Sequence, residues 1–275
     1  MTIPIIFSKL LGKKIIYISA GSLKKRNDDN EIIRIIENSI LKRINYQLSD
    51  KICLYSTRMA DATFLLKYKS KIFISQEHII DREKLFISNP INRRNLIVGY
   101  VGRFSSEKGI INLVESIKLI NDIEKDVHFL IIGEGPLKPY IEEFSKNNHL
   151  IDVLEIHEWV DHDKLNYYYN QFKILVIPSY TEGLPNVMLE AIFSGTPVLA
   201  TPVGSIPDYI QNNLTGFLLP DNSKESIATN ILSVLHNPNL EKITENAYNS
   251  IKEKFILEDN IKQYAKVIDD LLVGN

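Results

Sequence analysis

Short apolar runs alternate with longer stretches of helical periodicity along most of this chain. The short runs indicate buried strands, because they are too short to be helices. In the longer stretches, apolar residues recur every three or four positions, as on one face of a helix. From residue 96 onward the alternation predicts a complete doubly wound domain, with a parallel sheet and helical crossovers. The six expected strands are 96–101, 127–132, 153–156, 173–177, 197–201 and 216–219, and the three closing helices are 223–236, 240–254 and 258–272.

The first part of the chain shows the same alternation with fewer elements. Three strands are too few for a doubly wound sheet, so this domain is expected to be incomplete. The polar segment 89–95 breaks the pattern and is expected to link the two domains. The expected strands are 15–19, 51–55 and 71–74, with helices at 31–48 and 58–67. The expected division of the chain is 1–89, 90–257 and a final helix at 258–275.

The chain begins with an apolar run, Ile3–Leu11, which Lys13 and Lys14 follow. A secretory signal carries its basic residues ahead of the apolar run, so this segment does not match one. We expect a helix that faces the core, with contact to a membrane surface as the lesser alternative.

Composition narrows the classes of protein that fit. The chain has 275 residues, is 44% hydrophobic and 24% charged, and carries a formal net charge of -2. These values are typical of a soluble globular protein, and without an overall basic excess nucleic acid is not an expected partner. The single Cys53 excludes an internal disulfide, and no apolar span reaches the roughly 20 residues of a membrane helix. We therefore expect a cytoplasmic protein, peripheral at the membrane surface at most.

Two carboxylates flank an expected helix start after the expected strand 173–177. Glu182 follows the apolar run Ile174–Ile177, and Glu190 lies eight positions further on. Pro185 suits the first turn of a helix, where its missing N–H has no partner to lose. The free backbone N–H groups of that turn make an anion site. One carboxylate can then bind hydroxyls beside a bound phosphate while the other reaches different hydroxyls further back.

Two basic residues follow the first strand of the same domain. Arg103 and Lys108 lie on the loop after Leu96–Val101, at the carboxyl end of a strand, where open α/β sheets place their ligands. Arg offers a flat fork for two phosphate oxygens, and Lys a mobile point charge. Such cations would neutralise charge that builds on a departing diphosphate.

With three further motifs, these stretches resemble the retaining, nucleotide-sugar-dependent glycosyltransferases of family 4, which have the GT-B fold of two facing Rossmann-like domains. The matching motifs run in order from about residue 96 to residue 220. They are Gly102-Arg103 with Glu107-Lys108-Gly109, Ile132 to Leu137, Glu182 to Glu190 (the family's E-x7-E), Gly195 to Thr201, and Gly204 to Asp208.

The resemblance implies a role for each matched residue. Arg103 and Lys108 would bind the diphosphate, Glu182 the donor sugar and Glu190 the ribose hydroxyls, with no metal and no cofactor. The final helix would cross back to the first domain. The remaining expected donor-site residues are Gly102, Gly133, Val160, Gly183, Leu184, Pro185 and Asn186. At the loop that holds the base in the family, His157-Glu158 replaces the usual Phe-x-Gly pattern.

Plainer interpretations exist for each motif. The two glutamates also suit a solvated helix start, and the two basic residues an ordinary surface loop. Gly133-Glu134-Gly135 lacks the third glycine of a dinucleotide fingerprint, so it indicates a tight turn near the donor. The tyrosines of 167–169 point three ways around a helix and indicate mixed packing and surface. The polar residues that match no zinc spacing, and that we interpret as surface, are His157, Asp161, His162 and Asp163.

The resemblance also shows what this chain lacks. Family members open with further strand–helix units and carry a His that approaches the reacting sugar carbon, whereas this chain reads Tyr17 to Ser22 there, without a His. We therefore expect a glycosyltransferase that moves a sugar from a UDP or GDP donor to a lipid, glycan or small-molecule acceptor. Either a partner chain supplies the missing half of the first domain, or the gene is a truncated remnant. The alternatives are a donor-binding subunit or inactive nucleotide-sugar binder and, less favoured, a sugar-nucleotide epimerase.

Overall fold

The structure is a computed structural model that describes residues 2–19, 31–54, 65–75, 80–255 and 257–273. By its internal contacts the chain divides into two compact units. Unit 1 comprises Met1–Ile79 with Phe255–Asn275, and unit 2 comprises Ile80–Lys254. No helix among the described residues is long and apolar enough to cross a membrane.

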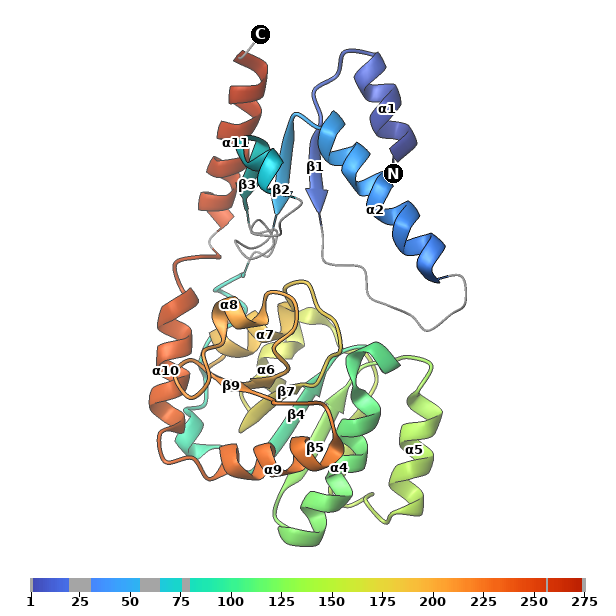
Figure 1. Cartoon of the computed structure of the whole chain (residues 1–275). Helices are drawn as coiled ribbons and strands as arrows, with labels where there is room; N and C mark the ends of the chain where they lie inside the picture. Colours follow the sequence, from blue (N-terminus) through green and yellow to red (C-terminus); the bar gives the residue numbers. More distant parts are fainter. Residues whose placement is uncertain (1, 20–30, 55–64, 76–79, 256, 274–275) are drawn as a thin grey trace. The chain divides into compact units, whose positions relative to one another are not determined.

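Unit 2 contains a six-stranded parallel sheet (Figure 1). All six strands expected in this part of the chain are confirmed, each within two residues of its predicted ends. They are β4 (Ile97–Val101), β5 (His128–Ile132), β6 (Leu154–His157), β7 (Ile174–Ile177), β8 (Val198–Ala200) and β9 (Phe217–Leu218).

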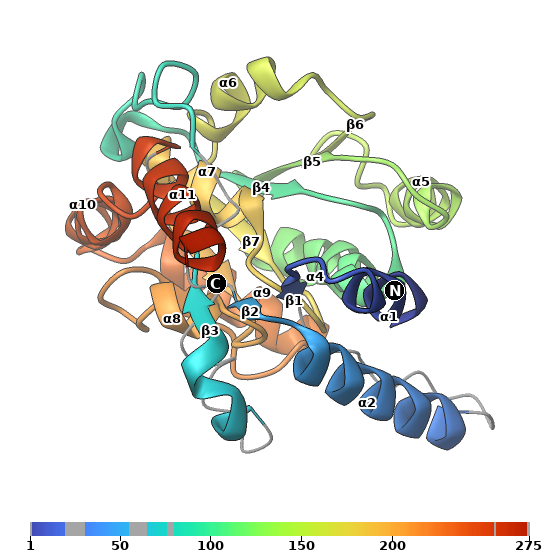
Figure 2. The same cartoon turned by 90° about the horizontal axis from the view of Figure 1, so that it is seen from above.

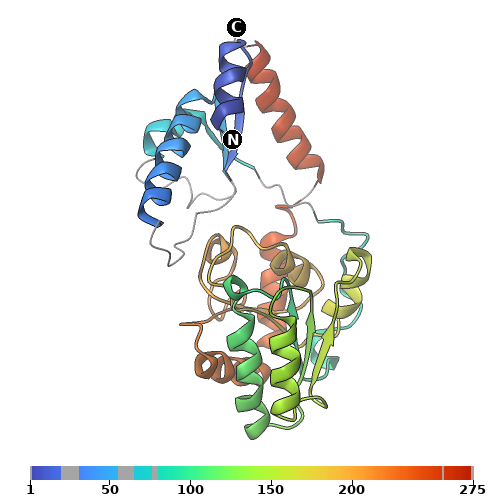
Figure 3. The same ribbon diagram turned by 90° about the vertical axis from the view of Figure 1, so that its right-hand side faces the viewer.

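The helices of unit 2 connect these strands and cover the sheet. Figure 3 shows two of them, α4 and α5 (green), side by side. The α-helices are α4 (Ile110–Ile123), α5 (Lys138–Asn147), α6 (Leu165–Tyr169), α7 (Asn186–Phe193), α8 (Ile206–Tyr209), α9 (Lys224–Leu235) and α10 (Leu240–Ile251). Short 3-10 turns lie at η2 (Ile91–Arg93), η3 (Ser106–Lys108) and η4 (His162–Lys164).

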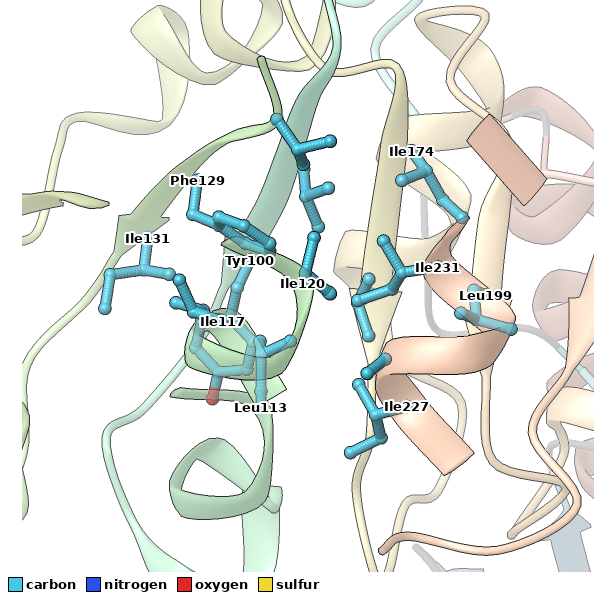
Figure 4. Close-up of a cluster of buried hydrophobic side chains, with 14 of the residues drawn as sticks. Tyr100, Leu113, Ile117, Ile120, Phe129, Ile131, Ile174, Leu199, Ile227 and Ile231 are labelled. Atoms are coloured by element: carbon cyan, nitrogen blue, oxygen red, sulfur yellow. The ribbon is translucent and has the colours of Figure 1, made fainter. Parts of the chain in front are cut away.

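The main core of unit 2 lies between the sheet and the helices α4 and α9 (Figure 4). Every second residue of a strand points into it, as Val98 and Tyr100 do from β4 and Phe129 and Ile131 from β5. The alternate strand residues are also largely buried, which explains why these strands are continuously apolar in the sequence.

The strand order of this sheet is β6-β5-β4-β7-β8-β9. The chain leaves β4 toward β5 and β6 on one side, then returns to pair β7 with β4 on the other. The order therefore reverses between β4 and β7. In open α/β sheets, ligands bind outside the carboxyl ends of the strands at such a switch point.

The segment before β4 is part of unit 2 and not a free linker. Arg94 is buried, and its guanidinium donates to the carbonyls of Tyr169, Phe172 and Ser194 at 2.8 to 3.0 Å. The backbone N–H of Ser88 donates to the Asn170 side chain. These bonds tie the segment to the carboxyl ends of α6 and α7 within unit 2, and the division falls at Ile80, earlier than the sequence pattern indicated.

Unit 1 contains a parallel sheet in the order β1-β2-β3. Its three strands and the helix α2 (Glu31–Leu48) confirm the predictions for this part, whereas the helix expected at 58–67 lies largely outside the described residues. The helix α11 (Leu257–Val273) belongs to unit 1, where the Tyr264 ring meets the Phe73 ring edge-on at 5.7 Å. The strands are β1 (Ile16–Ser19), β2 (Lys51–Leu54) and β3 (Ile72–Ile74), and the 3-10 turn η1 (Leu66–Lys71) directly precedes β3.

The helix α1 (Thr2–Leu10) corrects one prediction. It forms where expected and packs beside α2 in unit 1 (Figure 2), but none of its residues is buried. The expectation of a helix whose apolar residues face the core is therefore wrong.

Candidate functional site

The loops at the carboxyl ends of β4, β5 and β7 approach one another so closely that glycines are required. Gly109, at φ +68°, has no room for a Cβ, which would collide with the carbonyl oxygen of Pro178 after β7. Gly133 after β5 has none either, because of the carbonyl oxygen of Gly102 after β4. These approaches bring the separate sequence motifs to one end of the sheet, at the switch point.

Lys108 and Glu182 meet across this switch point. Lys108 Nζ donates to Glu182 Oε1 at 2.7 Å, and Ser179 Oγ donates to the same oxygen at 2.6 Å. The Glu182 side chain is 9% exposed and that of Lys108 31% exposed. Burying a carboxylate costs free energy, and hydrogen bonds with a nearby cation offset part of that cost. The structure thus joins two residues that the sequence could only place on separate loops.

Arg103 is exposed, on a backbone that buried groups hold in place. The Tyr100 hydroxyl donates to the Arg103 carbonyl at 2.8 Å, and the Phe104 N–H donates to the Glu134 carbonyl at 2.7 Å. Burial, with the negative charges of Glu182 and Glu107 nearby, raises the pKa of Tyr100, so the hydroxyl remains a donor. The exposed side chain of Arg103 is therefore accessible to a ligand, and its backbone is held in place.

Glu107 lies beside both basic residues of the loop. A hydrogen bond from Ser105 at 2.7 Å lowers the pKa of its carboxyl, and Arg103 and Lys108 lower it further. The N–H of Tyr180 donates to the Glu107 carbonyl at 2.9 Å, which is a second link between the loops after β4 and β7.

The start of α7 follows Glu182 closely in the chain. The helix begins at Asn186, with Pro185 as its N-cap residue, so Pro185 stands one position earlier than the first-turn position expected from the sequence. Leu184 is buried, and the Gly183 carbonyl accepts from Ser205 N–H at 2.8 Å. The first N–H groups of a helix have no partner within it, and they carry a partial positive charge.

Glu190 lies one turn inside α7 and is 6% exposed. Tyr169 donates from its hydroxyl to Glu190 Oε2 at 2.7 Å, and His162 Nε2 lies 3.0 Å from Oε1. Burial and the adjacent Glu190 raise the pKa of Tyr169 well above its usual range. This tyrosine therefore stays protonated and holds the carboxylate in one orientation.

Four of these contacts are not apparent from the sequence. No motif marks Tyr100 or Ser179, and Tyr169 is one of three adjacent tyrosines, of which it alone is buried. His162 is exposed, as the surface interpretation requires, but it pairs with Glu190 across loops that the sequence does not connect. A signal existed for Ser179, because it directly follows the Ile174–Ile177 strand and precedes Glu182 by three residues.

The remaining expected site residues lie around these clusters. The Gly102 N–H pairs with Ile132 and the Gly133 N–H with His157, which continues the sheet into the loops. Val160 is half-buried on the loop that leads from β6 to η4, the turn that supplies His162. Among the residues that the structure describes, no three His, Cys, Asp or Glu side chains gather as they would around a metal ion.

Residues 81–250 match the family described as glycosyl transferases group 1, and the chain belongs to this family. That assignment agrees with the motifs from 96 to 220 and with the parallel sheet that presents them.

Two curated relatives are named as glycosyltransferases and are longer than this chain. The chain is 24% identical over 289 residues to glycosyltransferase MJ1069 of Methanocaldococcus jannaschii, covering 97% of this chain and 71% of that protein. It is 29% identical over 167 residues to the capsular polysaccharide biosynthesis glycosyltransferase CapM of Staphylococcus aureus, covering 58% of this chain and 42% of CapM. The chain thus spans less than half of the second relative.

Solved structures confirm the expected GT-B-like fold of α/β domains with parallel sheets. Sucrose-phosphate synthase from Thermosynechococcus elongatus superposes with a TM-score of 0.80 at 21% identity, over 98% of this chain and 71% of that one. Anabaena HepE, crystallised with UDP and glucose, superposes with a TM-score of 0.76 at 16% identity, over 97% of this chain and 74% of that one.

Proposed function

We propose that this chain binds a nucleotide-diphosphate sugar at the switch point of unit 2 and transfers the sugar to an acceptor hydroxyl. The observation that carries the proposal is the Lys108–Glu182 contact of 2.7 Å beside the start of α7. The contact places the Lys108 ammonium, which would bind the diphosphate, next to the Glu182 carboxylate, which would bind sugar hydroxyls. Family membership and the UDP bound to HepE support the donor class, UDP-linked or GDP-linked.

The proposed reaction uses fixed charges in place of a metal. As the bond between the sugar and the diphosphate opens, Arg103, Lys108 and the N–H groups at the start of α7 stabilise the negative charge on the leaving group. Glu182 orients the sugar and lies close to the positive charge that develops on its ring. Transfer with retained configuration follows from the resemblance to family 4 and is part of the proposal.

Glu190 is the proposed ribose ligand. A carboxylate held by Tyr169 on one oxygen still has lone pairs for hydroxyl donors. Its second oxygen faces the exposed His162, on the side toward water. Ribose hydroxyls of the donor would replace the His162 imidazole as hydrogen-bond partners of this oxygen, or bind to the oxygen beside it.

Two substitutions test the assigned roles. Lys108→Ala removes a charge-assisted contact to phosphate and should weaken UDP binding by roughly tenfold to a hundredfold. Glu182→Ala should lower turnover by roughly a hundredfold or more and leave the dissociation constant for UDP within about threefold. Calorimetry with UDP and GDP measures binding, and release of nucleotide diphosphate from the donor measures turnover.

The matched control is Lys118→Ala, which removes an exposed lysine from α4 and should change neither quantity. Loss of binding and turnover together in Glu182→Ala, or of neither, contradicts the separate roles. Absence of UDP and GDP binding at millimolar concentration to the folded chain contradicts the donor site itself.

A second candidate is a donor-binding subunit whose partner chain completes the acceptor side. Unit 1 has three strands among its described residues, and the longer relatives extend beyond the region that this chain matches. In that case UDP raises the thermal unfolding temperature of the chain while donor and acceptor together release no nucleotide diphosphate. Release by the purified chain alone excludes this candidate.

A further inference from the structure

The helix α1 presents its apolar side to solvent. Five apolar residues recur at the spacing of one helix face, and all five are exposed. Thr2, Ile5 and Ser8, which point elsewhere around the helix, are half-buried instead. We name the five residues the α1 stripe: Ile3 (69% exposed), Ile6 (40%), Phe7 (62%), Leu10 (78%) and Leu11 (72%).

Local hydrogen bonds close the carboxyl end of this helix, and one ion pair ties it to the segment after α2. The N–H of Lys13 donates to the Ser8 carbonyl at 2.9 Å, and that of Gly12 to the Lys9 carbonyl at 3.0 Å. The Lys9 side chain pairs with Asp50 at 2.8 Å, and the same carboxylate accepts from the Ile15 N–H. The stripe is therefore a built, outward-facing surface. A contiguous apolar surface of this kind marks an interaction site.

The charge of this part of the chain indicates which partner fits. Unit 1, which comprises residues 1–79 and 255–275, contains 16 Lys and Arg against 11 Asp and Glu, whereas residues 80–254 contain 16 against 23. The near-neutral total conceals this asymmetry. Lys13 and Lys14 follow the stripe directly and are exposed. An apolar helix face with lysines at its end matches a surface that offers acyl chains and negative headgroups together.

A comparison within unit 1 supports the assignment to α1. Helix α11 also exposes apolar residues at one-face spacing, Ile261, Ile268 and Leu272. Exposed Asp269 and Asp270 lie among them, which an anionic surface would repel. A nucleic acid would suit the lysines of α1 but has no place for five aliphatic and aromatic side chains.

We propose that the α1 stripe, with Lys13 and Lys14, docks unit 1 onto an anionic lipid surface, α1 lying flat with its apolar side among the acyl chains. This docking is separate from the donor site, since none of its residues contributes to that site.

Co-sedimentation of the whole chain with vesicles tests the proposal. The chain should bind vesicles of phosphatidylcholine mixed with phosphatidylglycerol and bind those of phosphatidylcholine alone far more weakly, with binding that falls as salt rises. Replacing Phe7 and Leu10 together by Gln should weaken the binding roughly tenfold or more. Replacing Lys13 and Lys14 by Gln should weaken binding to the anionic vesicles by roughly thirtyfold and leave the residual binding to neutral ones unchanged.

The matched control is Ile123→Gln, an equally exposed apolar residue in unit 2 (72%), which should bind vesicles as the original chain does. All variants should keep their UDP affinity, so a failure of docking is distinguishable from a failure of the donor site. The proposal is overturned if the unsubstituted chain binds neither vesicle type, or if the Phe7 and Leu10 variant binds anionic vesicles as well as the control variant does. A dimer that the same variant dissolves, without vesicle binding, also overturns it and assigns the stripe to a second copy.

Discussion

At the scale of single residues, the candidate site consists of charged side chains that buried neutral groups hold in place. Tyr100 positions the backbone of Arg103, Ser179 donates to Glu182, and Tyr169 donates to Glu190. Glu182 and Glu190 are largely buried, and hydrogen bonds offset part of the free-energy cost of burying a carboxylate.

The Tyr169–Glu190 bond gives a measurable prediction. Tyr169→Phe removes a hydrogen bond to a buried carboxylate and should lower the free energy of unfolding by about 1.5 to 3 kcal/mol, because bonds to charged groups contribute that much. Urea unfolding measures the change. Tyr167→Phe is the control, since Tyr167 is 68% exposed and its hydroxyl should contribute little. Equal stability of the two variants would mean that the Tyr169 hydroxyl does not hold Glu190.

The sequence identified the charged residues of the site but not the groups that hold them. Glu182, Arg103 and Lys108 occur in recognisable motifs after apolar strands, so their positions at strand ends could be predicted. His162 of η4 and Tyr169 of α6 contact Glu190 of α7 although they lie 28 and 21 residues before it in the sequence. Local periodicity contains no information about such pairs. Three adjacent tyrosines also give no indication of which one is buried against Glu190.

At the scale of elements, the loops of unit 2 depend on positions where only glycine fits. The strand and helix ranges were predictable because apolar periodicity records burial directly. The contacts between loops were not, because Gly109 in the sequence does not reveal that Pro178 of another loop lies against it. The same limit applies to Arg94. Its buried hydrogen bonds make the segment part of unit 2, although its polar sequence predicted a linker.

Gly109→Ala should therefore destabilise the chain by more than about 2 kcal/mol, since it adds a left-handed backbone strain to a collision with the Pro178 carbonyl. It should also weaken UDP binding, because Lys108 is the preceding residue. Gly183→Ala is the control for stability: a Cβ there meets nothing within 4 Å, so the free energy of unfolding should change by less than about 1 kcal/mol. Denaturant titration of both variants measures the difference. A Gly109→Ala chain as stable as Gly183→Ala would mean that the two loops do not approach as described.

At the scale of the whole molecule, the chain combines two units with different roles and different charge. Unit 2 contains every residue of the candidate donor site, and its core is formed by its own strands and helices. Unit 1 contains the basic excess and the exposed α1 stripe. Apolar periodicity predicted that α1 is a helix but did not predict its orientation. An apolar face indicates that burial is favourable, but it does not indicate which partner buries it.

The last helix provides a test of whether the two units are separable in their effects. In unit 1, the Tyr264 ring packs edge-on against Phe73 of β3, and its hydroxyl lies 3.3 Å from the sulfur of Cys53 in β2. Tyr264→Ala should therefore speed hydrogen exchange of the backbone amides in β2 and β3, because these strands lose a packing partner. The same variant should keep its dissociation constant for UDP within about twofold, since every residue of the proposed donor site belongs to unit 2. Ile268→Ala, on the exposed side of α11, is the control and should alter neither measurement. If Tyr264→Ala weakens UDP binding as strongly as Lys108→Ala does, the donor site depends on unit 1, and its assignment to unit 2 alone must be abandoned.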